Sequence, residues 1–311
     1  MDHTTAIPEG YKDTSLAPRS FDSYIGQEKV KARLDTAMEG ARARYEPLKH
    51  TLILGPAGTG KTSLAEIIAS EMGEELMGMT MTPNFKMESL YKRLQNFEGG
   101  GIVFLDEIHC LNKKSQHYLL DVLEKKRMTY NTGKVVYLEN PITFVAATTE
   151  QDKLITPLYD RFPLRFQLSD YSEVEMAQIV ERMALQLGMH PTKEACLALG
   201  RASAGVPRQA RRLVQAAQDL GGLDDIDSIL KACVVTPEGL TEDHVAYMES
   251  LYDLGGRASI INIANHSMRP RDIVEALEQL LVKRKYVTLT PSGRVLEYEG
   301  IKVLKAALEN Q

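Results

Sequence analysis

Short apolar runs alternate with segments of helical spacing in the first half of the chain. Three apolar runs predict buried strands, at residues 51–54, 102–105 and 142–147. Apolar residues at helical spacing predict helices at residues 27–44, 63–72 and 114–126. Strands that alternate with helices predict an α/β fold with a parallel sheet covered on both faces.

The second half of the chain has two different patterns. Residues 172–235 are rich in alanine and leucine at helical spacing and show no strand signal, which predicts a small helical bundle. After Thr236 and Pro237 the pattern predicts three helices, a short β-hairpin and a last helix. The helices are expected at 241–254, 259–265 and 271–285, and the strands at 286–290 and 295–298, joined by a turn at 291–293. Three helices followed by a hairpin are typical of a winged helix.

These patterns divide the chain into four parts. The first 20 residues are polar and contain two prolines, which indicates an extended arm. An α/β domain at 21–170, a helical domain at 171–236 and a winged-helix domain at 237–311 follow. No internal repeat and no low-complexity tract is found.

Composition narrows the class of protein. The 311 residues suit two or three domains, and no apolar run approaches the 18 residues of a membrane-spanning helix. The start of the chain lacks a basic-then-apolar signal pattern, and three scattered cysteines do not favour a disulfide framework, so a cytoplasmic location is expected. The net charge of −5 excludes a surface that is basic all over, although a local basic patch remains compatible with it.

A complete phosphate-binding motif lies between the first predicted strand and the next helix. Residues 55–62 read GPAGTGKT and satisfy G-x-x-x-x-G-K-[ST] in full. The glycines allow backbone N–H groups to surround phosphates at a helix N-terminus. Lys61 is expected to contact the β- and γ-phosphates, and the Thr62 hydroxyl to ligate Mg²⁺. The predicted nucleotide-binding residues of this segment are Gly55, Pro56, Ala57, Gly58, Thr59, Gly60, Lys61, Thr62 and Ser63.

Two acidic residues end the second predicted strand. Asp106 and Glu107 follow the apolar run 102–105, about 45 residues after the phosphate loop. A buried parallel strand would deliver both carboxylates to the sheet edge that holds the loop. Asp106 is expected to hold Mg²⁺ through water, and Glu107 to polarise the attacking water. The sequence therefore predicts hydrolysis of ATP or GTP.

Three further residues are candidates for the hydrolytic site. Thr149 ends the third predicted strand, where its hydroxyl could orient the attacking water. Arg161 follows twelve positions later, and Arg208 begins a helix of the second region. Either arginine could stabilise the charge of the transition state, although on sequence alone each is also compatible with an ordinary surface charge.

Read together, these segments resemble AAA+ ATPases, and most closely the RuvB-type family of Holliday-junction branch-migration motors. The resemblance rests on residues 21–27 (FDSYIGQ), 106–112 (DEIHCLN), 147–149 (ATT), 157–162 (PLYDRF) and 290–294 (TPSGR). It extends over nearly the whole chain. Each motif occurs in many AAA+ proteins, but their combination with this C-terminal domain is fairly specific.

The resemblance implies a ring, expected to be a hexamer, with ATP bound between neighbouring subunits. Arg161 would act in trans on the nucleotide of the next subunit, and Arg208 would sense the γ-phosphate in cis. The positions that pack adenine in the family are occupied here by Leu16, Tyr24, Ile25 and Tyr171. The two tyrosines are also compatible with ordinary core packing, and His109 is expected to help set the geometry of the strand end.

One departure from the family affects a partner. Family members have a long hairpin with an apolar tip that grips the junction-recognition protein RuvA. The matching stretch here, 127–140, predicts a hairpin around Asn131, Thr132, Gly133 and Lys134 that is shorter and more polar. This difference argues against binding of a RuvA-type partner.

The winged-helix region carries a local excess of positive charge. Residues 256–296 contain seven Lys and Arg and three Asp and Glu, a balance of +4. Arg294 matches the DNA-contacting wing residue of the family, and Arg269 or Arg271 lies near a second such position. Contact with the phosphate backbone, without sequence preference, is therefore expected. A solvated basic face and a protein-docking module are the alternatives.

Three functions are compatible with the sequence. The leading hypothesis is an ATP-driven motor that moves duplex or branched DNA, with ATP and Mg²⁺ as cofactors and no membrane partner. The second is an ATP-gated helicase loader or clamp loader, a matchmaker that releases its partner on hydrolysis. The third is a scaffold with a vestigial site, which the intact phosphate loop and acidic pair argue against.

Overall fold

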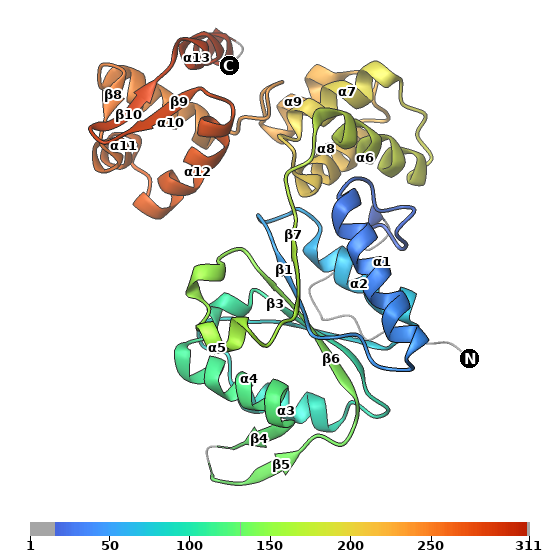
Figure 1. Ribbon diagram of the computed structural model, residues 1–311. Coiled ribbons are helices and arrows are strands. Elements are labelled where there is room, and N and C mark those ends of the chain that lie inside the picture. Colours follow the sequence, from blue (N-terminus) through green and yellow to red (C-terminus); the bar gives the residue numbers. More distant parts are fainter. Residues whose placement is uncertain (1–15, 131, 310–311) are drawn as a thin grey trace. The chain divides into compact units, whose positions relative to one another are not determined.

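The computed structural model describes residues 16–130 and 132–309 (Figure 1). The chain divides into two compact units, and the first ends at Tyr171. The predicted arm at 1–20 lies outside the described residues up to position 15, and so does Asn131 of the predicted turn.

The first unit is built on a five-stranded parallel sheet. Its strands are β1 (Thr51–Leu54), β2 (Leu76–Thr80), β3 (Gly101–Asp106), β6 (Ile142–Thr148) and β7 (Leu164–Gln167). They lie in the order β2-β3-β6-β1-β7, and every neighbouring pair is parallel. All carboxyl ends therefore meet at one edge of the sheet, which is where ligands bind in open parallel sheets.

Helices bury both faces of this sheet. Alternate residues of a strand point to opposite faces, so Ile102 and Phe104 of β3 join one hydrophobic core, and Val103 and Leu105 join another. Helices α1 (Glu28–Ala43) and α2 (Lys61–Met72) cover the first face. Helices α3 (Met87–Gln95) and α4 (Lys113–Lys125) cover the second (Figure 1).

A small antiparallel hairpin follows α4. Its strands β4 (Arg127–Thr129) and β5 (Val135–Tyr137) pair with Arg127 opposite Tyr137. The hairpin predicted from the sequence is thus present. Met128 is buried, whereas Val135 and Tyr137 on the second strand are exposed.

Two short helices connect strands β6 and β7. After β6 come the 3₁₀-helix η3 (Gln151–Lys153) and the short helix α5 (Thr156–Tyr159). Arg161 lies two residues past the end of α5 and precedes β7.

The second unit begins with four helices, where the sequence predicts a small helical bundle. They are α6 (Glu173–Gln186), α7 (Lys193–Ala202), α8 (Pro207–Asp219) and α9 (Ile226–Cys233). Three of these helices have an N-cap side chain that accepts a backbone N–H of the first turn. The N-cap residues are Ser172, Thr192 and Asp225. Helix α8 instead has Pro207 at its first position, where no N–H is needed.

The rest of the second unit is a winged helix. Its elements are α10 (Glu242–Asp253), β8 (Arg257–Ala258), α11 (Ile260–Ser267), α12 (Arg271–Lys283), β9 (Val287–Thr290), β10 (Gly293–Leu296) and α13 (Tyr298–Glu309). The three strands form an antiparallel sheet in the order β8-β10-β9. The predicted α/β core and winged helix are both confirmed, although the last strand ends at Leu296, because Tyr298 already begins α13.

Two further observations bear on the composition. None of the helices in the described segments has the length and apolar character needed to cross a membrane. Cys110, Cys196 and Cys233 are all free thiols.

Candidate functional site

The phosphate loop joins β1 to α2 in a conformation that needs its glycines. Gly55, Gly58 and Gly60 have positive φ angles of 150°, 79° and 101°, a region that side chains other than glycine rarely adopt. A Cβ atom on Gly60 would lie 2.8 Å from the hydroxyl oxygen of Tyr24. The loop conformation therefore requires glycine at these positions, and Tyr24 packs closely against Gly60.

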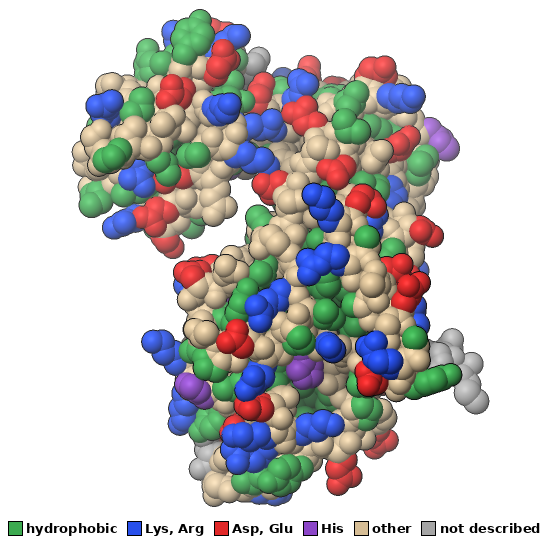
Figure 2. All heavy atoms as spheres, viewed as in Figure 1, with side chains coloured by type: hydrophobic (Ala, Val, Ile, Leu, Met, Phe, Trp, Pro, Cys, Tyr) green, Lys and Arg blue, Asp and Glu red, His purple; other side chains and the backbone are tan. Residues whose placement is uncertain are grey.

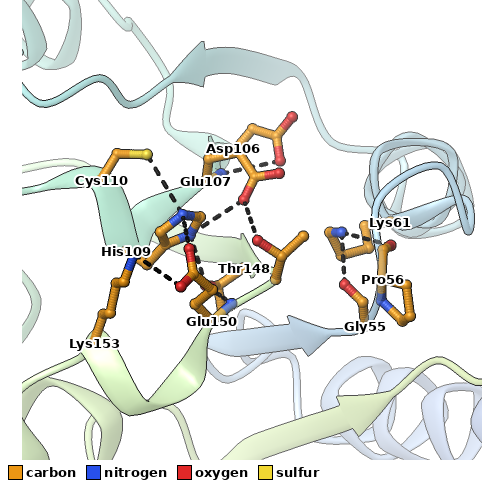
Figure 3. Close-up of polar contacts among 11 residues, drawn as sticks. Gly55, Pro56, Lys61, Asp106, Glu107, His109, Cys110, Thr148, Glu150 and Lys153 are labelled. Atoms are coloured by element: carbon orange, nitrogen blue, oxygen red, sulfur yellow. Dashed lines mark hydrogen bonds and ion pairs between the residues drawn. The ribbon is translucent and has the colours of Figure 1, made fainter. Parts of the chain in front are cut away.

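The N-terminus of α2 is suited to an anion. Its N-cap is Gly60, no side chain caps the first turn, and no acidic residue lies there. The backbone N–H groups of this turn are the donors that phosphates use at helix N-termini. Lys61 is buried, and its ammonium group donates to the carbonyl oxygens of Gly55 (2.8 Å) and Pro56 (3.0 Å) (Figure 3). Positive charge thus lies within the loop, and Thr62 and Ser63 follow in the first helical turn.

Two tyrosines predicted to lie near adenine contact the same loop. The Tyr171 hydroxyl donates to the Thr59 carbonyl oxygen at 3.0 Å, and that of Tyr24 to the Gly60 carbonyl oxygen at 3.4 Å. Burial and the adjacent Tyr171 hydroxyl raise the pKa of Tyr24 well above its usual value, so its proton stays in place. Leu16 is also buried, and Ile25 is half-buried.

The acidic pair lies where β3 ends. Asp106 is the last residue of the strand, and its Oδ1 accepts the backbone N–H of Glu107 at 3.0 Å. Glu107 has left-handed backbone angles (φ 50°, ψ 47°) and turns the chain into the 3₁₀-helix η2 (Ile108–Cys110). For a residue other than glycine this conformation is uncommon and occurs often at functional sites.

The oxygen donors present fit Mg²⁺. A hydroxyl at Thr62 and a carboxylate at Asp106 are the kind of ligands this ion takes, with water and substrate phosphates completing the octahedron. Among the described residues no group of three or more His, Cys, Asp or Glu side chains could hold a metal by itself. At these two donors Mg²⁺ would need water and phosphate oxygens to complete its coordination.

Strand order brings three separate segments to this edge. Strand β6 lies between β3 and β1, so the segment after β6 runs between the acidic pair and the phosphate loop. The Thr149 hydroxyl, one residue past the end of β6, donates to Oε2 of Glu107 at 3.3 Å. Thr149 and Glu107 are 42 positions apart in the sequence and meet only because their strands are neighbours.

A polar cluster lies beside Glu107, around the histidine that was expected to help set the geometry of this strand end, and its other members were not predicted. Nδ1 of His109 lies 3.2 Å from Oε2 of Glu107 and 3.0 Å from the Thr148 hydroxyl, and its Nε2 lies 3.2 Å from Oε1 of Glu150. The other Glu150 oxygen pairs with Lys153 at 2.8 Å (Figure 3). Asp106 and Glu107 were marked because they follow an apolar run directly, whereas Glu150 lies two residues past the end of β6 and lacked that signal.

The two candidate arginines lie in different units. Arg161 is part exposed and forms an ion pair with Glu124 of α4 at 2.9 Å. Arg208 is an exposed residue of the first turn of α8. Because it belongs to the second unit, its approach to the phosphate loop stays a prediction.

All three arginines predicted to bind DNA form ion pairs within the winged helix. Arg269 pairs with Asp243 (2.6 Å) and Arg271 with Glu275 (2.7 Å), and all four side chains are well exposed. Arg294 pairs with Glu278, whose side chain is only 9% exposed. Figure 2 shows positive and negative side chains interspersed over the visible face rather than one continuous basic surface. Contact with DNA by these residues stays a prediction.

Two family models match this chain. The model described as the Holliday junction DNA helicase RuvB P-loop domain matches residues 16–168, and that of the RuvB C-terminal winged helix domain matches residues 237–305.

Individual relatives match over nearly the full length. A Holliday junction branch migration complex subunit RuvB from Campylobacter fetus subsp. fetus is 33% identical over 310 residues, which cover 95% of this chain and 90% of the relative. The subunit of the same name from Aliarcobacter butzleri is 31% identical and covers 97% and 92%. Among solved structures, the Thermotoga maritima RuvB Holliday junction branch migration motor superposes with a TM-score of 0.81 at 29% identity, covering 94% of this chain and 98% of that one.

Proposed function

This chain belongs to the RuvB family, and from that membership we propose that it hydrolyses ATP to drive branch migration of Holliday junctions. The observation that supports this most directly is the meeting of three segments at one sheet edge. The phosphate loop, the pair Asp106 and Glu107, and Thr149 follow β1, β3 and β6, which are adjacent strands.

Within one subunit, the residues divide the work of hydrolysis. The loop residues 55–63 hold the phosphates with backbone N–H groups, and Lys61 leaves its loop carbonyls to contact the β- and γ-phosphates. Thr62 and, through water, Asp106 would hold Mg²⁺, which would supply positive charge to neutralise the phosphates. Glu107 accepts the proton of the attacking water, and Thr149 orients that water or the carboxylate itself.

Adenine recognition and the transition-state charge use residues from outside the sheet edge. Leu16, Tyr24, Ile25 and Tyr171 surround the base, and the contacts of both tyrosines with the phosphate loop support this assignment. Arg208 senses the γ-phosphate in cis. Arg161 is supplied in trans to the next subunit of a hexameric ring, and to do so it leaves Glu124.

The winged helix grips the DNA backbone in this proposal. Arg269, Arg271 and Arg294 contact phosphates after exchanging their carboxylate partners, so the affinity falls with salt and has little sequence preference. The helical domain 171–236 connects this grip to the ATPase domain. The loader alternative is disfavoured, because both family models and the relatives are RuvB proteins.

A RuvA-type partner is not part of the proposal. The hairpin has strands of three residues, and its exposed apolar side chains, Val135 and Tyr137, lie along the second strand. We expect junction-stimulated hydrolysis by this chain to be unchanged when a RuvA-type protein is added. A rise in that rate would assign the hairpin the binding role.

The test of the proposal is ATP turnover without DNA, with linear duplex and with a synthetic four-way junction, together with branch migration of the junction. We expect stimulation by DNA and ATP-dependent migration. Glu107→Gln should bind ATP and lose at least about 100-fold in turnover, as expected for loss of a general base. Turnover without migration would instead support the loader.

A further inference from the structure

His109 lies beside the acidic pair with both ring nitrogens engaged. Its side chain is only 10% exposed and sits in η2, directly after the left-handed turn at Glu107. Nδ1 faces Glu107 Oε2 (3.2 Å) and the Thr148 hydroxyl (3.0 Å), while Nε2 faces Glu150 Oε1 (3.2 Å) (Figure 3). Rotation of the ring would break the contacts on both sides, so the ring orientation is fixed by two strand ends.

The partners of the ring are themselves held. Thr148 is fully buried, and its hydroxyl oxygen accepts the backbone N–H of Glu150 at 3.0 Å. Oε2 of Glu150 pairs with Lys153 at 2.8 Å, which keeps Oε1 turned toward the ring. The end of β6 and the segment after it therefore contact both ring nitrogens of His109.

The contacts of Glu107 are one-sided. Among the described residues, the Thr149 hydroxyl and the His109 ring both reach Oε2 of Glu107. A carboxylate tethered through one oxygen presents the other in a defined direction. A general base needs this, because misplacement by about 1 Å can cost on the order of 100-fold in rate.

We propose that His109 is a positioning residue that aims the Glu107 carboxylate, and that Glu150 sets the orientation of its ring. This inference rests on the proposed role of Glu107 as the base. The segment bearing Glu150 and Lys153 continues through α5 to Arg161. Glu150 thus links Glu107, through the His109 ring, to the segment that carries Arg161.

Four variants of the full chain separate this role from a structural one. His109→Ala removes both contacts, His109→Asn keeps a donor near the Nδ1 position, and His109→Gln reaches only toward Glu150. Glu150→Ala leaves the ring and the contact of its Nε2 with the Cys110 sulfur (3.6 Å) but removes the carboxylate that faces Nε2. His190→Ala, at an exposed position before α7, is the matched control. The readouts are kcat, KM, the Kd of a fluorescent ATP analogue and the melting temperature.

We expect His109→Ala to lower kcat about 10- to 100-fold with KM and Kd within about twofold. His109→Asn should recover most of the loss, and His109→Gln should not. Glu150→Ala should lower kcat less, and it should have no further effect in the His109→Ala background, since it acts through the ring.

Each contrary result has one meaning. If Glu107→Gln keeps the wild-type rate of turnover, Glu107 is not the general base and the proposed mechanism is wrong. If Glu107→Gln is inactive while His109→Ala keeps turnover within about twofold, the positioning role is wrong. Equal losses of kcat, nucleotide affinity and melting temperature in His109→Ala and His109→Asn would reduce His109 to a structural residue. If the losses of kcat in His109→Ala and Glu150→Ala are fully additive in the double variant, Glu150 does not act through the ring.

Discussion

Arg294 and Glu278 form a two-pronged ion pair inside the winged helix, with Nε to Oε1 at 2.7 Å and Nη2 to Oε2 at 3.1 Å. The Tyr247 hydroxyl also donates to Oε1 of Glu278, at 2.9 Å. This hydrogen-bonded pairing raises the pKa of Arg294 above its usual value. The wing residue of β10 is thus tied to a buried carboxylate of α12.

Removal of Arg294 should therefore destabilise the winged helix. Arg294→Ala leaves a buried carboxylate without its cationic partner and with only the Tyr247 hydrogen bond, and we expect a loss of about 3 kcal/mol in the free energy of unfolding. Arg269→Ala breaks an exposed pair and should cost less than about 1 kcal/mol. Urea unfolding followed by circular dichroism measures both. Equal small losses would mean that the buried pair contributes no net stability.

DNA binding is better tested at the exposed arginines, because their removal barely affects folding. Replacing Arg269 and Arg271 by alanine should weaken binding uniformly across duplex sequences. Each lost phosphate contact should lower the slope of log K against log salt concentration by about 1. Fluorescence anisotropy at several salt concentrations gives the slope. An unchanged slope would place the DNA contacts elsewhere.

The trans role of Arg161 predicts complementation. Arg161→Ala and Glu107→Gln should each be inactive alone, because one lacks the finger and the other the base. In a 1:1 mixed ring, about a quarter of the interfaces combine an intact site with an intact finger. Mixing the two inactive proteins should therefore restore measurable ATP turnover. No recovery, despite mixed rings seen by native mass spectrometry, would mean that Arg161 does not act across the interface.

Gly60 and Tyr24 should be coupled in nucleotide binding. Gly60→Ala places a Cβ 2.8 Å from the Tyr24 hydroxyl at a φ of 101°, so the loop must distort. We expect at least a tenfold loss of ATP affinity, from backbone strain of about 1–3 kcal/mol and from the clash. Tyr24→Phe should recover part of this loss by removing the hydroxyl, while the strain remains. Isothermal titration of Gly60→Ala, Tyr24→Phe and the double variant with ATP measures the coupling. Strictly additive losses of affinity would contradict the contact.

His244 predicts a loss of stability in mild acid. Burial lowers its pKa from 6.5 to about 4, and the Thr241 backbone N–H donates to its Nδ1 at the start of α10. The unfolded chain takes up a proton below pH 6.5 and the folded chain only near pH 4, so stability is full above pH 6.5 and falls between these values. The contribution lost at pH 5 is about 2 kcal/mol. His244→Gln, which keeps a side chain suited to this cap, should flatten the pH dependence of unfolding measured from pH 8 to pH 5. The same slope in both proteins would show that other groups cause it.

The local structure of the phosphate loop could be predicted from the sequence more readily than the strands around it. A motif such as GPAGTGKT fixes its own local structure, because glycine angles and a helix start are local properties. Strands β2 and β7 were not predicted. Leu76–Thr80 contains a glycine and two methionines, and Leu164–Gln167 alternates polar and apolar residues over only four positions, so packing beside β3 and β1 determines both strands.

The partners of the charged residues could not be predicted from the sequence either. The pairing of His109 with Glu150 and of Arg294 with Glu278 depends on which strands and helices become neighbours. A count of basic residues in 256–296 could not reveal that Arg269, Arg271 and Arg294 are each matched by a carboxylate.

Strand β6 also determines when the site can first exist. It comes after β1 and β3 in the chain but inserts between them. A nascent chain that has left the ribosome only as far as residue 141 lacks the strand to which both β1 and β3 pair, so its phosphate loop and its acidic pair have no common sheet. Late insertion of a central strand is a long-range step and slows folding. Nucleotide therefore cannot assist the early folding of this domain during synthesis, and can stabilise it only after β6 has emerged.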